Sequence, residues 1–168
     1  MISRRAFMEI AARFGGAAAL LAGCHPRGTR QAGQSAQADT MPLVNDVHSQ
    51  LNATRVRAIR QPTSDGMLAS VVRDARANGD ALSIAGGRHA MGGQQFGTGT
   101  VLIDMNGMRR VLEFDRARGE IEVEAGIQWP ELYAYLGEHS AGAGGWSFRQ
   151  KQTGADRLSI GGALAANV

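Results

Sequence analysis

Ala81-Leu82-Ser83-Ile84-Ala85-Gly86-Gly87-Arg88-His89-Ala90-Met91-Gly92-Gly93 is the stretch that decides the fold. Its first five residues predict a buried strand, and the next eight contain four glycines, one arginine and one histidine. Glycines let backbone N–H groups converge on an anion and let the chain approach a ligand closely. The pattern therefore indicates either a loop that binds phosphate groups or a structural Gly-rich turn.

Two common phosphate-binding loops do not fit this stretch. The glycine spacing differs from G-x-G-x-x-G, and residues 94–103 lead into a strand, whereas a dinucleotide-binding loop leads into a helix. No Gly-Lys-Ser or Gly-Lys-Thr sequence occurs, which excludes a P-loop. A phosphate site here therefore belongs to another fold.

Regular elements are predicted on both sides of this loop. Alternation over residues 56–59 predicts a short strand, and Thr63 and Ser64 are N-cap candidates for a helix that ends at Gly79. After the loop, the pattern predicts a strand, a hairpin and a helix that has Pro in its first turn, over residues 100–104, 109–125 and 129–138. The fold class is α+β.

Four blocks of this sequence, in a fixed order, resemble one flavoprotein family. They read S-I-A-G-G-R-H-A-M-G-G, V-L-I-D-M-N-G-M-R-R-V, G-E-I-E-V-E-A-G-I-Q-W-P-E-L and T-G-A-D-R-L-S-I-G-G-A-L-A-A-N. Together they are similar to the FAD-binding domain of the vanillyl-alcohol oxidase/p-cresol methylhydroxylase (PCMH-type) family. The resemblance runs from about Val56 to Val168 and implies the N-terminal part of a PCMH-type FAD-binding domain.

The resemblance implies two segments that contact an extended FAD. The first would hold the pyrophosphate on its backbone, and the second would line the flavin ring and the pyrophosphate. The implied residues of the first segment are Ala85, Gly86, Gly87, Arg88, His89, Ala90 and Met91; those of the second are Gly154, Ser159, Gly162, Ala166 and Asn167. The alternative for the second segment is an apolar core turn, and we interpret Leu158, Ile160 and Leu164 as packing residues.

His89 stands where many members of the family carry a histidine bonded covalently to the flavin. A neutral imidazole nitrogen is a suitable nucleophile for such a bond. Arg88 precedes it where Gly is frequent, and Ala90 follows it where Ser is usual. Two interpretations therefore stay open, covalent attachment of FAD through His89 or a hydrogen bond from this side chain to the cofactor.

The N-terminal residues are typical of an exported protein. Arg4-Arg5-Ala6-Phe7-Met8 resembles a twin-arginine signal, and Leu21-Ala22-Gly23-Cys24 resembles a lipobox whose Cys24 is acylated. We expect a twin-arginine-type lipoprotein signal peptide over residues 1–23, a flexible linker over 24–50 and an FAD-binding domain, incomplete at its C-terminus, over 51–168. The expected location is the periplasmic side of a bacterial membrane, which the protein contacts through a lipid anchor alone.

Composition excludes several other classes of function. Without the three arginines and one glutamate of residues 1–23, the formal charge falls from +3 to +1, and charges of both signs are interleaved. A nucleic-acid surface requires clustered basic and stacking residues, so no nucleic-acid partner is expected. The single cysteine and the scattered histidines predict neither a disulfide nor a metal site.

The resemblance implies an FAD-dependent oxidoreductase, either an oxidase or a dehydrogenase, that acts on CH–OH donors. Its substrate would be a small alcohol, sugar, alditol or lactone that gives a hydride to the flavin, and oxygen or an electron carrier would be the acceptor. Catalytic residues are expected in a substrate domain beyond this sequence, so this portion alone is expected to be inactive. The alternatives are a lipid-anchored remnant that binds flavin or nucleotide without catalysis and a nucleotide-binding module unrelated to flavin.

Overall fold

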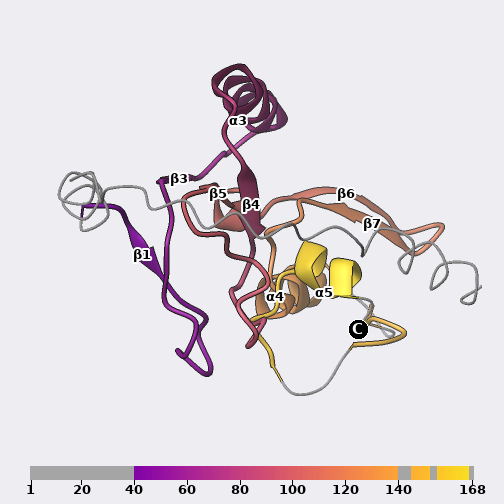
Figure 1. Cartoon of the computed structure of the whole chain (residues 1–168). Coiled ribbons are helices and arrows are strands. Elements are labelled where there is room, and N and C mark those ends of the chain that lie inside the picture. The colour runs from indigo at the N-terminus through magenta and orange to yellow at the C-terminus, as the bar shows by residue number, and fades with distance from the viewer. Residues whose placement is uncertain (1–39, 140–144, 152–154, 167–168) are drawn as a thin grey trace, which may run out of the picture. The chain divides into compact units, whose positions relative to one another are not determined.

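The structure, a computed structural model, describes residues 40–139, 145–151 and 155–166 (Figure 1). They all belong to one compact unit, residues 34–168. The predicted signal peptide, Cys24 and the first part of the predicted linker lie outside the described residues, as do Gly154 and Asn167. In the described part of the chain, no helix has the length and apolar character needed to cross a membrane.

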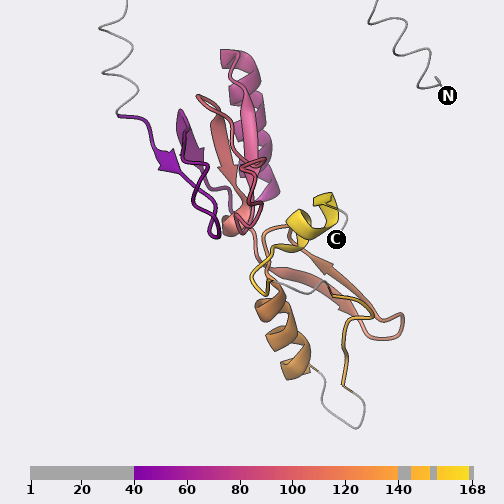
Figure 2. The same cartoon turned by 60° about the horizontal axis from the view of Figure 1, so that its bottom comes forward.

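A parallel sheet of three strands forms one half of the unit. The strand order is β3-β5-β4, with β3 at Ala58–Arg60, β5 at Val101–Asp104 and β4 at Leu82–Ala85. All four residues of β5 are buried because this strand has a neighbour on each side. Helix α3, Asp65–Asn78, connects β3 to β4 and runs alongside the sheet (Figure 2).

Helix α3 begins and ends where its capping residues predict. The side-chain oxygen of Ser64 accepts a hydrogen bond from the N–H of Met67 at 3.3 Å. Gly79 ends the helix with a φ of 69°, in the left-handed region that favours glycine. The predicted helix is therefore confirmed at both boundaries.

A hairpin and two helices form the other half of the unit. The hairpin consists of β6, Val111–Asp115, and β7, Glu120–Val123; the helices are α4, Trp129–His139, and α5, Ile160–Ala166. Ile127, Trp129 and Leu132 form the centre of its core, against which Leu158 and Ile160 pack. A short 3-10 helix, η1, Met105–Gly107, leads from β5 towards the hairpin. The predicted hairpin and the helix at 129–138 are confirmed.

The folded unit starts before Leu51, where we placed the start of the domain. Strand β1, Leu43–Val44, pairs antiparallel with β2, Thr54–Arg55. Val44 is buried and packs in the same core cluster as Val56. Residues 40–50 are therefore part of the fold. A flexible linker stays a prediction for residues 24–39, which lie outside the described residues.

Candidate functional site

The loop Gly86–Gly93 follows directly on β4, and several of its backbone carbonyls accept hydrogen bonds from the protein. The Gly86 carbonyl accepts from Nδ2 of Asn106 at 3.1 Å, and the Arg88 carbonyl accepts from the N–H of Val47 at 3.0 Å. The Met91 carbonyl accepts from the hydroxyl of Ser49 at 3.2 Å and from Nδ2 of Asn52. These contacts turn the carbonyls towards the rest of the fold.

The N–H groups of the same loop have the opposite arrangement. Among the described residues, none accepts a hydrogen bond from the backbone N–H of residues 87–92. The loop is half-buried or exposed and contains no acidic residue. A series of unpaired backbone donors beside glycines is suited to an anion such as a diphosphate.

Arg88 lies in the middle of this loop with an uncommon backbone conformation. Its φ is 58°, in the left-handed region that non-glycine residues rarely occupy. Its guanidinium Nη2 lies 2.7 Å from Oδ2 of Asp104, at the end of β5, and both side chains are largely buried. The ion pair holds the strained residue in place and neutralises the carboxylate nearest the loop.

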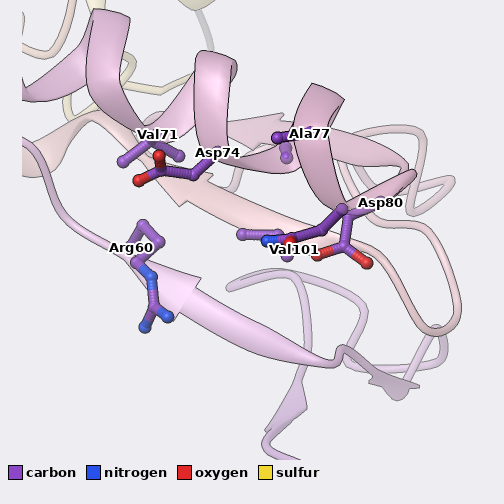
Figure 3. A pocket seen from close by; sticks show the side chains of 8 residues that line it. Arg60, Val71, Asp74, Ala77, Asp80 and Val101 are labelled. Atoms are coloured by element: carbon purple, nitrogen blue, oxygen red, sulfur yellow. The ribbon is translucent and has the colours of Figure 1, made fainter.

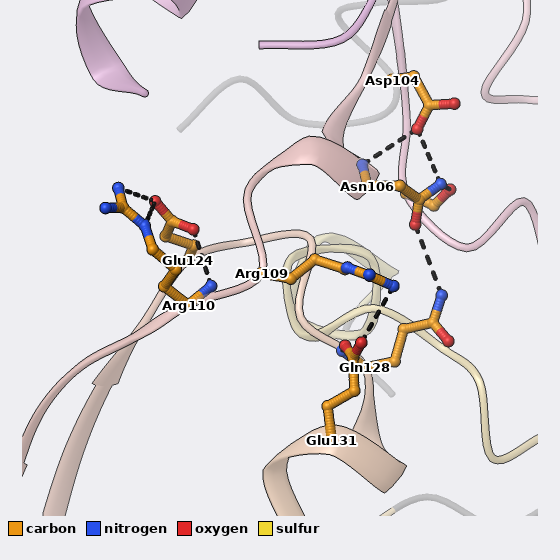
Figure 4. Close-up of polar contacts among 8 residues, drawn as sticks. Asp104, Asn106, Arg109, Arg110, Glu124, Gln128 and Glu131 are labelled. Carbon is orange, nitrogen blue, oxygen red and sulfur yellow. Dashed lines mark hydrogen bonds and ion pairs between the residues drawn. The ribbon is translucent and has the colours of Figure 1, made fainter. Parts of the chain in front are cut away.

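Asp104 also begins a polar network that joins the two halves of the unit (Figure 4). Its Oδ1 accepts from the backbone N–H and from Nδ2 of Asn106, at 3.0 and 2.8 Å. Oδ1 of Asn106 accepts from Nε2 of Gln128 at 3.5 Å, just before α4. Because Asn106 also donates to the Gly86 carbonyl, this network fixes the start of the loop.

The second predicted segment lies directly against the loop. A Cβ at Gly86 would lie 2.9 Å from Cβ of Ser159, and one at Gly87 would lie 2.5 Å from the backbone oxygen of Arg157. Both glycines are therefore required by close approach. Ser159 is buried, and its hydroxyl accepts from the N–H of Gly162 at 3.3 Å. We call residues 86–93 together with residues 157–162 the cradle.

The remaining predicted residues take different positions. Ala85 is buried in the core at the end of β4, so its side chain packs inside the fold. Ala90 and Met91 are exposed in the loop, and Ala166 is exposed at the end of α5. Leu164 was interpreted as a packing residue, but its side chain is exposed because it lies on the uncovered side of α5.

His89 contacts a second histidine, His48, which lies in the predicted linker. Nδ1 of His89 lies 2.7 Å from Nε2 of His48. Burial lowers the pKa of His89, the nearby His48 lowers it further, and a backbone hydrogen bond with Arg157 opposes them. Burial and the neighbouring ring therefore favour the neutral form of His89.

The segment 45–52, which carries His48, is organised by a buried carboxylate. Asp46 accepts from the backbone N–H groups of His48 and Ser49, at 2.9 and 2.6 Å, and from the hydroxyl of Ser49 at 2.8 Å. Burial raises the pKa of Asp46, but hydrogen bonds from Ser49, Asn52 and Gln50 outweigh burial and hold this pKa well below its usual range. Local bonds of this kind require only Asp, Ser and Asn at short spacing.

One other buried carboxylate, Glu124, lies outside the cradle. Oε1 of Glu124 accepts from Nε and Nη2 of Arg110, at 3.0 and 2.7 Å, and these hydrogen bonds lower the pKa of Glu124 (Figure 4). This pair joins the residue that precedes β6 to the residue that follows β7. In the described part of the chain, no group of three or more His, Cys, Asp or Glu side chains could hold a metal ion.

A pocket of about 290 Å³ lies between α3 and the sheet (Figure 3). We call it the α3 pocket. Charged side chains of both signs line it, among them Arg60, Asp74 and Asp80, and Asp80 also pairs with Arg57. No residue of the cradle lines it, so the α3 pocket is separate from the loop with the unpaired donors.

Comparison with known proteins agrees with this geometry. The family model described as "FAD binding domain" matches residues 56–168, most of the chain. The chain belongs to this family. The match begins two residues before β3 and includes the whole cradle, whose unpaired N–H groups suit the diphosphate of FAD.

Curated relatives of this FAD-binding domain include two lactone-oxidising enzymes by name. L-gulono-1,4-lactone dehydrogenase of Mycobacterium tuberculosis is 33% identical over 108 residues, which cover 64% of this chain and 24% of the relative. L-gulonolactone oxidase of Mus musculus is 34% identical over 79 residues, which cover 47% of this chain and 18% of the relative. The chain therefore spans about a quarter or less of the length of these relatives.

A solved structure shares the fold. Alkyldihydroxyacetonephosphate synthase matches with a TM-score of 0.56 and 27% identity, covering 64% of this chain and 21% of that one. Together with the family match, this likeness confirms the predicted fold, a mixed α and β FAD-binding domain of PCMH type. FAD is the cofactor of this domain.

Proposed function

We propose that this chain is the FAD-binding part of an FAD-dependent oxidoreductase that oxidises a CH–OH group of a small lactone or sugar-like alcohol. The observation that supports it most is the cradle, a loop with unpaired N–H donors in a domain similar to two enzymes named for gulonolactone. Because the chain spans about a quarter of these relatives, we assign no catalytic residue within it.

The residues of the cradle would hold and orient the cofactor. The N–H groups of residues 87–92 would donate to the diphosphate, and Gly86 and Gly87 keep the surface free of side chains there. Arg88 stays paired with Asp104, so the carboxylate does not repel the phosphates. When bound, FAD supplies the acceptor for the hydride, and the protein supplies its position.

His89 is our candidate for covalent attachment of the flavin. Its ring lies within the cradle, where Cδ2 would be 2.9 Å from a Cβ on Gly87, and burial favours its neutral form. A covalent flavin remains yellow in acid-precipitated protein, and replacing His89 with Ala should move the colour to the supernatant. Colour in the wild-type supernatant would contradict covalent attachment and leave a hydrogen-bonding role.

Export and lipid anchoring belong to the same proposal. The sequence of residues 1–24 supports a twin-arginine lipoprotein signal with acylation at Cys24, and therefore a periplasmic location. Cells fed a labelled fatty acid should label the protein, and Cys24→Ser should remove the label. Equal labelling of both proteins would contradict acylation at Cys24.

Substrate-driven reduction tests the enzyme function directly. The protein, purified with its native neighbouring sequence, is mixed without oxygen with a panel of aldonolactones, sugars and alditols. We expect at least one lactone or sugar-like alcohol to bleach the visible flavin band, and readmitted oxygen or an added dye to restore it. A flavin that stays oxidised with every compound would contradict the oxidoreductase and favour a binding protein without catalysis.

A further inference from the structure

His48 and His89 are 41 residues apart in sequence, but their rings meet at the cradle. Nε2 of His48 and Nδ1 of His89 are separated by 2.7 Å, with ring centroids 4.7 Å apart. At this distance one nitrogen donates a proton and the other accepts it. Two fully protonated rings would instead place two N–H groups and two positive charges face to face.

The backbone of His48 is fixed with respect to the same loop. The N–H of His48 donates to the buried carboxylate of Asp46 at 2.9 Å. The N–H of its neighbour Val47 donates to the Arg88 carbonyl at 3.0 Å. The ring of His48 is exposed, yet these contacts hold it at a defined place beside His89.

The charged residues around the pair have other partners. Asp46 accepts the backbone N–H of His48, and the side chain of Arg88 is turned to Asp104. Arg157 differs, because its backbone forms a hydrogen bond with the His89 ring itself. Among the described residues, His48 is thus the one side chain that forms a hydrogen bond with the His89 ring.

We propose that His48 is a positioning residue of the flavin site, whose hydrogen bond to His89 fixes the orientation of that ring and couples its tautomer to that of His48. The inference rests on the proposed function, since the flavin is the group that His89 would meet. A neutral ring in one tautomer keeps a lone pair on a defined nitrogen, which both a covalent bond and an accepted hydrogen bond require. His48 lies outside residues 56–168, so the matched domain does not contain it.

Nuclear magnetic resonance of ¹⁵N-labelled histidine side chains tests this role without flavin or turnover. In the wild-type protein we expect His89 to show a single tautomer and a lowered pKa. In His48→Phe, which keeps a ring without nitrogens, we expect a mixture of tautomers. The His89 pKa should rise part of the way towards about 6.5, because the neighbouring charge is lost while burial remains.

One further variant separates the effect of the hydrogen bond from that of the charge, and another is a control. His48→Gln restores a hydrogen-bonding group without a titratable charge, so it should restore the single tautomer and leave the His89 pKa raised. His139→Gln is the matched control, because Nδ1 of His139 contacts the Tyr135 carbonyl within α4. It should leave His89 unchanged. If His48→Phe fails to fold, the reciprocal variant His89→Gln should free the tautomer of His48.

Identical shifts and titration of His89 in the wild type and His48→Phe would overturn the inference. A different result would contradict the proposed function. A protein that binds FAD and is reduced by substrate, but shows no coupling between the two rings, contradicts the role of His48 alone. A protein with coupled rings that never binds FAD contradicts the proposed function alone.

Discussion

The cradle and the α3 pocket differ in what they offer a ligand. The α3 pocket is a cavity lined by charged side chains of both signs, and one of them, Asp80, is paired with Arg57. The cradle presents backbone N–H groups of residues 87–92 that have no acceptor among the described residues, and the carboxylate of Asp104 beside it is paired with Arg88. The comparison indicates that the arrangement of donors, more than the presence of a cavity, identifies the cofactor site.

Gly87→Ala should weaken FAD binding more than the other substitutions below. The new Cβ would lie 2.5 Å from the Arg157 oxygen and 2.9 Å from the His89 ring, which forces the two sides of the cradle apart. We expect FAD to bind about 100-fold more weakly, or about 2.7 kcal/mol. Fluorescence titration of the apoprotein with FAD measures this affinity.

Gly137→Ala is the control for this prediction. Nothing lies within 4 Å of a Cβ at Gly137, on the exposed side of α4. Ala should stabilise the helix by about 0.5–1 kcal/mol and leave FAD affinity unchanged. Equal affinities of Gly87→Ala and Gly137→Ala for FAD would show that the cradle is not the binding site.

Arg88→Gln should have the next largest effect. It removes the ion pair with Asp104 but keeps a left-handed backbone that is costly for a non-glycine residue. We expect about 10-fold weaker FAD binding, or about 1.4 kcal/mol. Arg88→Gly, which relieves the backbone cost, should lose less, and Arg57→Gln on the exposed pair with Asp80 should lose nothing.

Asp46→Asn should lower the stability of the folded protein by a small amount that depends on pH. The folded pKa of Asp46 lies below the ordinary value of about 3.9, so its contribution to stability is complete above that pH and is lost as the pH falls through the folded pKa. Urea denaturation should therefore show the wild type as more stable than Asp46→Asn at pH 7, with the difference narrowing in acid. A difference that grows as the pH falls would contradict the role of the carboxylate.

The smallest effect is expected in the α3 pocket. Asp74→Asn changes the charge of the pocket and touches no residue of the cradle. FAD affinity, measured by the same titration, should stay within about twofold of the wild type, since distant surface substitutions are nearly neutral. A loss as large as that of Arg88→Gln would place the α3 pocket in the binding site.

The elements that follow local rules were predictable from sequence. Ser64 and Gly79 mark the ends of α3 because capping uses only neighbouring residues. The Gly-rich loop was also predictable, because four glycines within eight residues are evident in the sequence itself. Their contacts with Arg157 and Ser159 were not predicted, since no local pattern encodes a contact over seventy or so residues. The family resemblance placed Ser159, but not Arg157, at the cofactor.

The elements that depend on distant contacts were harder to predict. Residues 40–50 show no apolar period, and β1 is two residues long, so their order comes from bonds around the Asp46 carboxylate and to the loop. Helix α5 contains Gly161 and Gly162, which disfavour a helix. It forms because the N–H groups of Ile160 and Gly161 donate to backbone carbonyls at Ile127 and Ala125.

A visible spectrum of the purified protein, recorded with its native neighbouring sequence before and after addition of FAD, shows whether the cradle binds the cofactor. We expect a yellow protein, or an apoprotein that takes up one FAD per chain. ADP, which carries the same diphosphate, should block this uptake. A colourless protein that cannot be reconstituted with FAD would contradict the cradle as a cofactor site.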